Sequence, residues 1–333
     1  MSKRFLIVGG GSMGRRRIRC LAANHVAPEQ IRVVDVRPDR RGDVLKRHQV
    51  ESLPDLDAGL AWGPDAVFVC VYPEAHLEIC LAAARAGKHV FCEVPLAIEP
   101  TGIDELRRLA ETKSLVVAPA CQVPFHPLVR QAKQWLDDPA FPAPLICHFV
   151  SGQYLPDWHP YEDYGEYFAA ASQKTGGVSL DVIAMYLTSL YWMIGDRFSR
   201  LYCEGSRLST LAIDGCDCHQ IIARSAGGMV LTYQSDLIRR APEATLQIIN
   251  EQGTVEVGLD RARRFLKSAG RWETVGLPDG FQYEQCYVDE VTRFLECLEG
   301  RAEWLISLET AVDVIRFWRA AEKSAATGGP VDL

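Results

Sequence analysis

The first part of the chain alternates short apolar runs with stretches that have the spacing of amphipathic helices. The apolar runs, which we predict to be strands, are residues 5–8, 31–36, 66–71, 89–92 and 115–119. The intervening helices are predicted from Met13 onward and over residues 39–48, 74–86 and 101–111. Almost continuously apolar strands separated by helices are typical of a parallel sheet covered on both faces. We therefore predict a doubly wound Rossmann domain over residues 1–122.

The pattern changes after His126. Helices are predicted over residues 127–136 and 178–194, a strand over 145–153, and a run of β-like segments from 198 to 274. Turn signals such as Ala226-Gly227-Gly228 separate these segments, which is typical of a meandering, largely antiparallel sheet. Two helices, 283–299 and 307–327, end the chain. We predict an α+β domain over 123–333, with a large open sheet, helices on one face, and C-terminal helices that could pack back on the first domain.

Composition narrows the class of protein. Of the 333 residues, 48% are hydrophobic and 24% are charged, which is ordinary for a folded globular protein. No apolar run approaches the ~18–20 residues that cross a bilayer, so we expect no membrane association and a cytoplasmic location. The net charge of −7, with both signs interspersed, makes nucleic acid an unexpected partner.

Cysteine usage gives no indication of a disulfide framework or a metal centre. The 11 cysteines are scattered singly through segments that we predict to be core, where a thiol acts as a small hydrophobic group. Cys216-Asp217-Cys218-His219 could suggest zinc, but it lacks a fourth ligand and the usual wider cysteine spacing. We interpret these four residues as part of a sheet and predict no metal site.

A glycine-rich segment follows the first strand and opens a helix. Residues 9–14 read Gly-Gly-Gly-Ser-Met-Gly, a G-x-G-x-x-G pattern. Gly9 would permit a tight turn, Gly11 would let the backbone approach a pyrophosphate, and Gly14 would pack the helix against the strand. The helix start at Ser12 and Met13 would face the anion with free N–H groups. The segment therefore predicts a dinucleotide site.

The second strand ends in an acid about 20 residues further on, where dinucleotide-binding domains place a ribose ligand. Asp35 would accept hydrogen bonds from the adenosine ribose hydroxyls and repel a 2′-phosphate, which favours NAD. Arg37, Arg40 and Arg41 follow directly and could instead clamp that phosphate. We predict NAD as the cofactor, with NADP as the alternative.

Residues 86–97, Ala-Gly-Lys-His-Val-Phe-Cys-Glu-Val-Pro-Leu-Ala, resemble the A-G-K-H-V-x-x-E-K-P-L-A motif of the glucose-fructose oxidoreductase / inositol dehydrogenase / rhizopine-catabolism (Gfo/Idh/MocA) family. Other matching segments occur in the family's order. They are the glycine loop, V-Y-P-E-A-H at 71–76, F-H-P at 125–127, G-G-V-S-L-D at 176–181 and K-S-A-A-T-G at 323–328. The resemblance covers essentially the whole chain.

The resemblance implies a nicotinamide cofactor over the carboxyl edge of the parallel sheet, and a carbohydrate or cyclitol between it and the open second sheet. That sheet often forms the subunit interface, so a homodimer or homotetramer is expected. The resemblance places Glu93 at the nicotinamide ribose and Gln122 against the nicotinamide. The other residues that it places along the cofactor are Val71, Tyr72, Pro73, His76 and Val94. Taken alone, His76 could equally be a residue on a helix surface.

Two positions depart from the family's pattern. Its catalytic lysine falls at Val94, and the histidine of its D-x-x-x-H helix motif falls at Met185, whereas the aspartate is retained as Asp181. Neither Val nor Met can hold an ammonium beside the reacting oxygen or transfer its proton. We therefore name Asp181, Tyr186 and His159 as catalytic candidates, although Tyr186 could instead be a core residue.

An aromatic loop and the missing acid–base pair leave several functions open. The loop over residues 154–164 could stack its rings on sugar faces, or be a plain connecting loop. We expect a dehydrogenase or reductase that transfers a hydride at a ring carbon of a sugar, nucleotide sugar or cyclitol. The alternatives are a redox-neutral lyase or glycosidase that uses bound NAD, and a cofactor-binding protein without catalysis.

Overall fold

The computed structural model describes residues 3–158, 164–165 and 180–333, which form two compact units. The first unit consists of Met1–Gln122 and Tyr283–Val312, and the second consists of Val123–Gln282 and Asp313–Leu333. The segment 283–312 thus groups with the first unit, although in sequence it lies between the two parts of the second unit.

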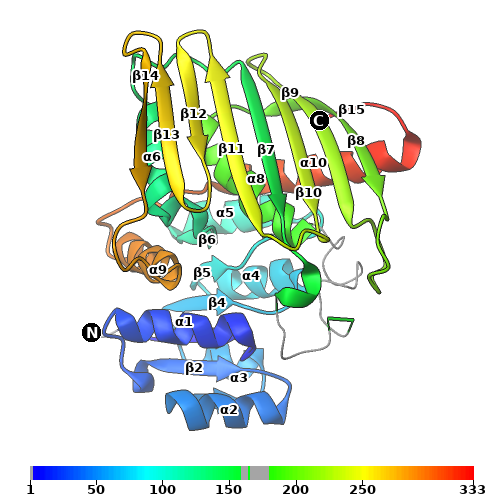
Figure 1. Cartoon of the computed structure of the whole chain (residues 1–333). Helices are drawn as coiled ribbons and strands as arrows, with labels where there is room; N and C mark the ends of the chain where they lie inside the picture. The colour runs from blue at the N-terminus through cyan, green and yellow to red at the C-terminus, as the bar shows by residue number, and fades with distance from the viewer. Residues whose placement is uncertain (1–2, 159–163, 166–179) are drawn as a thin grey trace. The chain divides into compact units, whose positions relative to one another are not determined.

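The first unit is built on a six-stranded parallel sheet with strand order β3-β2-β1-β4-β5-β6 (Figure 1). Its strands are β1 Phe5–Val8, β2 Ile31–Val34, β3 Glu51–Leu53, β4 Ala66–Val69, β5 His89–Cys92 and β6 Val117–Pro119. The strand order changes direction between β1 and β4, and in open α/β sheets the ligand crevice lies outside the carboxyl ends of the strands at that point. This arrangement confirms the predicted Rossmann sheet.

Helices surround that sheet. They are α1 Ser12–Ala23, α2 Pro38–His48, α3 Leu56–Ala61, α4 His76–Arg85, α5 Ile103–Lys113 and α9 Glu284–Leu298, with short 3-10 turns η1 Pro28–Gln30 and η2 Pro73–Ala75. Neither β3 nor α3 was predicted from the sequence. The three residues of β3 form a partly exposed edge strand, so they lack the apolar run that marks the inner strands.

Aromatic rings from distant parts of the sequence meet in the core of the first unit. The Phe68 and Phe91 rings stack with centroids 4.9 Å apart, and Phe294 of α9 packs edge-on against them at 5.4 and 5.3 Å. All three side chains are fully buried. Because aromatic side chains bury large apolar areas, this cluster anchors α9 to the parallel sheet.

The second unit is built on a nine-stranded sheet with strand order β14-β13-β12-β11-β7-β10-β9-β8-β15. Only the β7–β10 pair is parallel within it, so the prediction of a mostly antiparallel sheet is confirmed. Its strands are β7 Ile146–Gly152, β8 Phe198–Ser206, β9 Cys218–Ser225, β10 Val230–Asp236, β11 Glu243–Asn250, β12 Gly253–Val257, β13 Arg261–Leu266, β14 Arg271–Gly276 and β15 Val331–Asp332.

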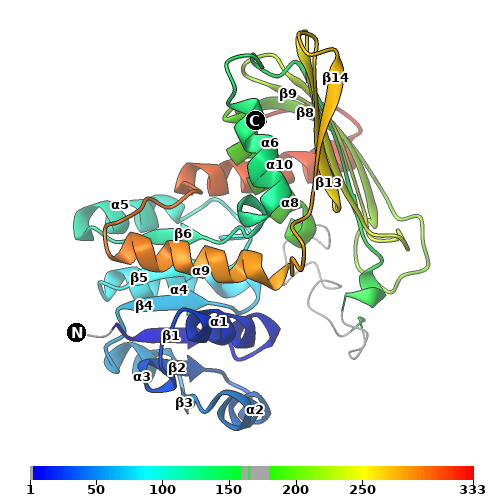
Figure 2. The ribbon, with the colours of Figure 1, turned by 60° about the vertical axis from the view of Figure 1, so that its left-hand side comes forward.

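Helices lie on one face of this large sheet and leave the other face open (Figure 2). They are α6 Pro127–Leu136, α8 Leu180–Ile194 and α10 Leu308–Thr327, and short turns η3 Val123–Phe125 and η4 Leu155–Asp157 complete the elements. Side chains of β9 therefore alternate between buried and exposed along the strand, since one face of the sheet is covered and the other is not. Within the described residues, no helix is both long enough and apolar enough to cross a membrane.

Candidate functional site

The glycine loop makes a tight connection between β1 and α1. Gly9 has a φ of 102°, a conformation that L side chains rarely adopt, and a Cβ there would lie 2.3 Å from the Cys70 carbonyl oxygen. A Cβ on Gly14 would lie 1.8 Å from the Gly9 carbonyl oxygen. Neither position can accept a side chain unless the backbone moves. The chain therefore needs glycine at both places to bring α1 close to the end of β1.

Gly11 is different, because the space beside it is not filled by backbone. An added Cβ would find its nearest neighbours in the Arg40 guanidinium, 3.5 Å away at Nη1. Gly11 also has an ordinary φ of −71° and precedes the first turn of α1, where Ser12 is exposed and no acidic residue occurs. A helix start of this kind attracts anions through its N–H groups and partial positive charge. These residues fit the pyrophosphate of a dinucleotide.

Asp35 lies directly after β2 with only 6% of its surface exposed. Its Oδ2 accepts a hydrogen bond from the Gly10 amide at 2.8 Å, and its Oδ1 accepts one from the Arg37 amide at 2.8 Å. Two backbone donors therefore fix the carboxylate beside the glycine loop. This is the position at which an acid can bind the adenosine ribose hydroxyls.

The three arginines after Asp35 have separate surroundings. Arg37 is exposed and forms an ion pair with Asp39 at 2.6 Å, and Arg41 donates to the Asp35 carbonyl oxygen at 2.7 Å. Arg40 lies 3.8 Å from the Asp35 carboxylate as well as beside Gly11. Of the three, Arg40 is the cation placed where a phosphate of the cofactor would lie.

His76 is buried, with 1% of its surface exposed, so it is not a helix-surface residue. Its Nδ1 lies 2.7 Å from the Pro95 carbonyl oxygen and its Nε2 lies 3.1 Å from the Val71 carbonyl oxygen. Burial lowers the pKa of His76, although both carbonyl oxygens oppose this by favouring the protonated ring. The imidazole thus joins the segment after β4, where Tyr72 and Pro73 also lie, to the segment after β5.

Glu93 follows β5 and is held by an arginine that the sequence analysis did not consider. Arg17 of α1 donates through Nε and Nη2 to the two Glu93 carboxylate oxygens, at 2.6 and 3.1 Å. Glu93 is 9% exposed and Val94 after it is half-buried. Each carboxylate oxygen can accept more than one hydrogen bond, so Glu93 keeps capacity for a ribose hydroxyl.

Gln122 follows β6 and is held by the start of α9. Its Nε2 donates to the Tyr287 hydroxyl at 3.2 Å and to the Tyr283 hydroxyl at 3.5 Å. Carboxyl ends of parallel strands share one edge of a sheet, so residues after β1, β4, β5 and β6 gather there. The structure therefore brings the predicted cofactor residues of the first unit to a single edge.

The catalytic candidates belong to the second unit, and the structure describes them unevenly. Tyr186 of α8 packs edge-on against Phe149, whose ring stacks on Tyr233 at a centroid distance of 4.8 Å. Burial raises the pKa of the Tyr186 hydroxyl, which makes it a weaker acid than an exposed tyrosine. His159 lies outside the described residues. Asp181 lies in the first turn of α8, but its side chain is also outside the description.

The described part of the aromatic loop forms a small apolar cluster. Leu155 is buried there, and Tyr154, Trp158 and Tyr164 pack at its edge against Leu211, Ile213 and Leu237. The Tyr164 hydroxyl accepts a hydrogen bond from the Ala212 amide at 3.1 Å, and the Arg240 guanidinium lies 3.5 Å above the Tyr154 ring. These rings therefore have packing partners within the protein.

The segment Cys216–His219 leads into β9, whose first two residues are Cys218 and His219. Asp217 is buried and accepts hydrogen bonds from the Leu208 and Ser209 amides, at 2.8 and 2.9 Å. The His219 ring packs edge-on against Trp318 with centroids 5.1 Å apart. Among the residues that the structure describes, no three His, Cys, Asp or Glu side chains gather as metal ligands would.

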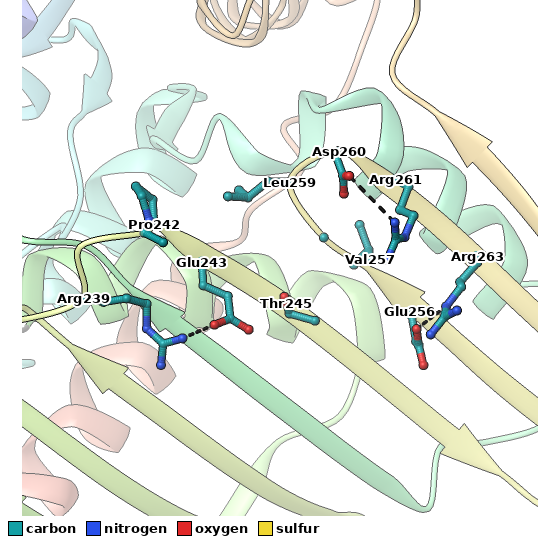
Figure 3. Close-up of a pocket in the computed structure, with 12 residues that line it drawn as sticks. Arg239, Pro242, Glu243, Thr245, Glu256, Val257, Leu259, Asp260, Arg261 and Arg263 are labelled. Atoms are coloured by element: carbon teal, nitrogen blue, oxygen red, sulfur yellow. Dashed lines mark hydrogen bonds and ion pairs between the residues drawn. The ribbon is translucent and has the colours of Figure 1, made fainter.

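A cavity of about 440 Å³ lies on the second sheet, and none of the predicted site residues is among those that line it (Figure 3). Its lining comes from β11, β12, β13 and the segment before β11. The charged side chains around it are already paired, Arg239 with Glu243 and Arg263 with Glu256. Because the lining offers balanced and paired charges, the cavity adds no catalytic group to the site.

The residues of this site that sequence analysis missed are Arg17, Glu290, Tyr283 and Tyr287. Arg17 lies one turn after Gly14, on the side of α1 that faces the sheet, so a buried charge could have been suspected there. Glu290 interrupts the apolar face of α9, whose buried positions include Cys286, Val291 and Phe294. A carboxylate among apolar positions of a helix is a signal for a buried cation, because such groups are rarely buried without a partner.

Comparisons with known proteins agree with this geometry. Residues 3–120 match the family model described as an oxidoreductase family with an NAD-binding Rossmann fold, GFO_IDH_MocA. The uncharacterized oxidoreductase YrbE of Bacillus subtilis is 21% identical over 98% of this chain and 95% of its own length. Inositol 2-dehydrogenase 3 of Saccharopolyspora erythraea is 26% identical, over 81% of this chain and 77% of its own length.

Solved structures share the fold along the whole chain. Levoglucosan dehydrogenase in complex with NADH superposes with a TM-score of 0.89 at 20% identity, covering 100% of this chain and 99% of that one. The WlbA dehydrogenase from Bordetella pertussis, in complex with NADH and UDP-GlcNAcA, superposes with a TM-score of 0.82 at 18% identity, with the same coverage. With its glycine loop, its Asp35 and this match, the Rossmann part of the chain, residues 3–120, resembles the Gfo/Idh/MocA family of oxidoreductases, and the remainder shares the fold of these solved structures.

Proposed function

We propose that this chain is an NAD-dependent dehydrogenase or reductase that acts on a ring carbon of a sugar, nucleotide sugar or cyclitol. The observation that carries the proposal is the glycine loop tied to the buried Asp35 carboxylate, in a chain whose residues 3–120 match an NAD-binding oxidoreductase family. When bound, NAD would supply hydride transfer at its nicotinamide ring. The protein must hold the reacting carbon within ~3–3.5 Å and manage one proton.

Three groups of residues would hold the cofactor. The loop Gly9–Gly14 and the start of α1 would bind the pyrophosphate, and Asp35 would bind the adenosine ribose. Glu93, fixed by Arg17, would bind the nicotinamide ribose. The buried position of the Asp35 carboxylate favours NAD over NADP, because a 2′-phosphate would meet a like charge.

The substrate class rests on relatives whose names specify it. Inositol 2-dehydrogenase and levoglucosan dehydrogenase are similar to this chain over most or all of its length, and both are named for polyhydroxylated ring compounds. A ring compound of this kind offers a secondary alcohol as the reacting group. The site must then bind several hydroxyls, for which the residues around α8 and the loop after β7 are the candidates.

Proton transfer in this reaction would have to use groups other than the family's usual lysine and histidine. Val94 and Met185 stand where lysine and histidine are usual in the family, and neither side chain carries an exchangeable proton. The Tyr186 hydroxyl is protonated at neutral pH, as tyrosine hydroxyls ordinarily are, so it can donate to an oxygen that becomes an alcohol. Asp181 and His159 are the other candidates for this role.

The two hydrophobic replacements also favour a second function. A redox-neutral reaction on bound NAD, such as a lyase or glycosidase step, or cofactor binding without turnover, would tolerate the loss of this acid–base pair. These alternatives predict that added NAD shows no net reduction with any substrate. They therefore differ from the first proposal in a simple optical assay.

The test is a panel of sugars, nucleotide sugars and cyclitols incubated with the protein and NAD, with NADH formation followed by absorbance. Ketone forms and NADH would be tested in the reverse direction. Substrate-dependent formation or consumption of NADH supports the dehydrogenase. Chemical change of a substrate without net change in NADH, detected by mass spectrometry, would contradict it and support the redox-neutral reaction.

We also propose that the chain forms a homodimer or homotetramer through the open face of the second sheet. A row of side chains crosses this face in register, with Tyr202 beside Ile222 and Ile222 beside Thr232. Ile222 is 55% exposed, which is unusual for a large hydrophobic residue in the middle of a sheet. Light scattering of Ile222→Asp against wild type tests this, since the variant should shift towards monomer.

A further inference from the structure

Arg17 is a fully buried cation that contacts two carboxylates at once. It binds Glu93 through two N–H groups, at 2.6 and 3.1 Å, and donates through Nη1 to Glu290 Oε2 at 2.7 Å. The side chains of Arg17 and Glu290 have no exposed surface. A buried ion without a partner is strongly destabilising, so the three side chains depend on one another.

Further contacts fix the triad Arg17–Glu93–Glu290 from several elements. Glu290 Oε1 accepts a hydrogen bond from the Cys121 amide at 2.6 Å, directly before Gln122. The Arg17 guanidinium also lies 4.5 Å from the centre of the Phe91 ring. The triad therefore connects α1, the segment after β5, the segment after β6 and α9, all within the first unit.

The position of Glu93 in this triad suggests what the other two residues do. Glu93 is the only one of the three with any exposed side-chain surface, and its segment leads directly into Val94 at the carboxyl edge of the sheet. A carboxylate held by two parallel N–H donors has a fixed orientation. Arg17 could rotate away if only Glu93 held it, but the Glu290 contact fixes the other side of the guanidinium.

We propose that Arg17 and Glu290 are positioning residues for Glu93, and that α9 thereby fixes the contact with the terminal ribose of the dinucleotide. This inference rests on the proposed function, because it takes Glu93 as a ligand of that ribose. It adds that a helix from the last sixth of the chain determines how strongly the nicotinamide half is held. The adenosine half, bound through Gly9–Gly14 and Asp35, does not depend on it.

Binding of two ligands, ADP and ADP-ribose, measures the contributions of the adenosine half and of the terminal ribose separately. ADP contains the adenosine ribose and pyrophosphate, and ADP-ribose adds the terminal ribose without the nicotinamide. The ratio of their dissociation constants, measured by calorimetry on the full chain, reports the contact at the terminal ribose. Hydrogen bonds to charged groups contribute about 1.5–3 kcal/mol, so Glu93→Ala should lower the wild-type preference for ADP-ribose by about tenfold or more.

The variants of Glu290 test the inference. Glu290→Ala should lower the preference for ADP-ribose towards that of Glu93→Ala, whereas affinity for ADP stays near wild type. Glu290→Gln keeps an oxygen acceptor and the side-chain shape, so it should retain most of the preference. Glu284→Ala is the matched control, because Glu284 also joins α9 to α1, through Arg16 and Arg19, without contacting the triad.

Several outcomes would overturn the inference. One is an unchanged ADP-ribose preference in Glu290→Ala, and another is an equal loss of affinity for both ligands, which would indicate a structural role only. An ADP-ribose preference that is unchanged in Glu93→Ala would also overturn the inference. If Arg17→Met folds, it should lower the ADP-ribose preference as Glu290→Ala does. If it does not fold, the Glu290 variants alone test the inference. Failure of wild type to bind ADP or NADH would instead contradict the proposed function.

Discussion

The Gly10 amide donates a hydrogen bond of 2.8 Å to the Asp35 carboxylate, and this bond ties the phosphate loop to the end of β2. Because the carboxylate is buried and fixed, it should discriminate between the two forms of the cofactor. We predict that NADH binds more tightly than NADPH. Asp35→Ala should reduce this preference by about tenfold, since it removes both a ribose ligand and the charge that repels a phosphate. Fluorescence titration with both cofactors measures the change, and a wild-type preference for NADPH would refute it.

Arg40 should contribute more to dinucleotide binding than Arg37. Arg40 lies beside Gly11 and Asp35, whereas Arg37 is exposed and paired with Asp39. We expect Arg40→Ala to weaken NADH binding by about tenfold, as loss of a charged contact would, and Arg37→Ala to change it less than twofold. Equal effects of the two substitutions would show that Arg40 does not contact the cofactor.

Tyr186 should act as a proton donor if the chain is a reductase. A tyrosine hydroxyl is protonated at neutral pH, and burial raises the pKa of Tyr186 further, so this hydroxyl can donate its proton to a strongly basic oxygen such as a developing alkoxide. Once a substrate is known, Tyr186→Phe should lower kcat for reduction by ~10²–10⁴ at saturating NADH. Tyr191→Phe, on the same helix but packed against Phe198, is the control. Asp181→Asn and His159→Asn should be compared in the same assay, and wild-type kcat in all three would exclude this proton relay.

The stability of the second unit should fall in mild acid because of His219. Burial lowers the pKa of this imidazole from 6.5 to about 4. The unfolded chain then binds a proton between these values while the folded chain does not, so stability is full above pH 6.5 and decreases as the pH falls towards 4. The whole effect is roughly 3 kcal/mol. Urea unfolding at pH 7.5 and 5 should show a smaller pH difference for His219→Gln than for wild type.

A matched control for this pH dependence is His148→Gln, on the exposed face of the same sheet. It should retain the wild-type difference between the two pH values. If His219→Gln also retains it, the acid sensitivity comes from another group.

The parallel sheet of the first unit and the glycine loop could be predicted because they depend on local patterns. Apolar runs such as 5–8 and 66–71 indicate buried parallel strands. The spacing of Gly9, Gly11 and Gly14 is typical of the turn that binds the pyrophosphate of a dinucleotide. The short edge strand β3 was not predicted from the sequence, because a half-exposed strand of three residues has no apolar run. In the second unit the β7–β10 parallel pairing was not foreseen either, because pairing partners distant in sequence leave no local signal.

The site itself was only partly predictable, for a similar reason. Asp35 and Glu93 stand in motifs, so their positions could be anticipated from the sequence. Glu290 lies 273 positions after Arg17, and only folding brings the two side chains within 2.7 Å. The sequence can mark each as a charge on the apolar side of a helix, but it does not show that the two form a pair. Burial, which makes their pairing necessary, is a property of the assembled unit.

The central claim, that this chain binds NAD(H) through the loop of residues 9–14, is tested most directly by calorimetric titration of wild type and Gly11→Val with NADH. Gly11 has an ordinary φ, and a Cβ there would meet the Arg40 side chain at an ordinary contact distance, so the variant should fold as wild type does, which its thermal unfolding would verify. The valine side chain would occupy the space that the pyrophosphate needs. We predict saturable binding by wild type and no measurable binding by Gly11→Val. Equal affinity of the two proteins, or no binding by either, would contradict the account.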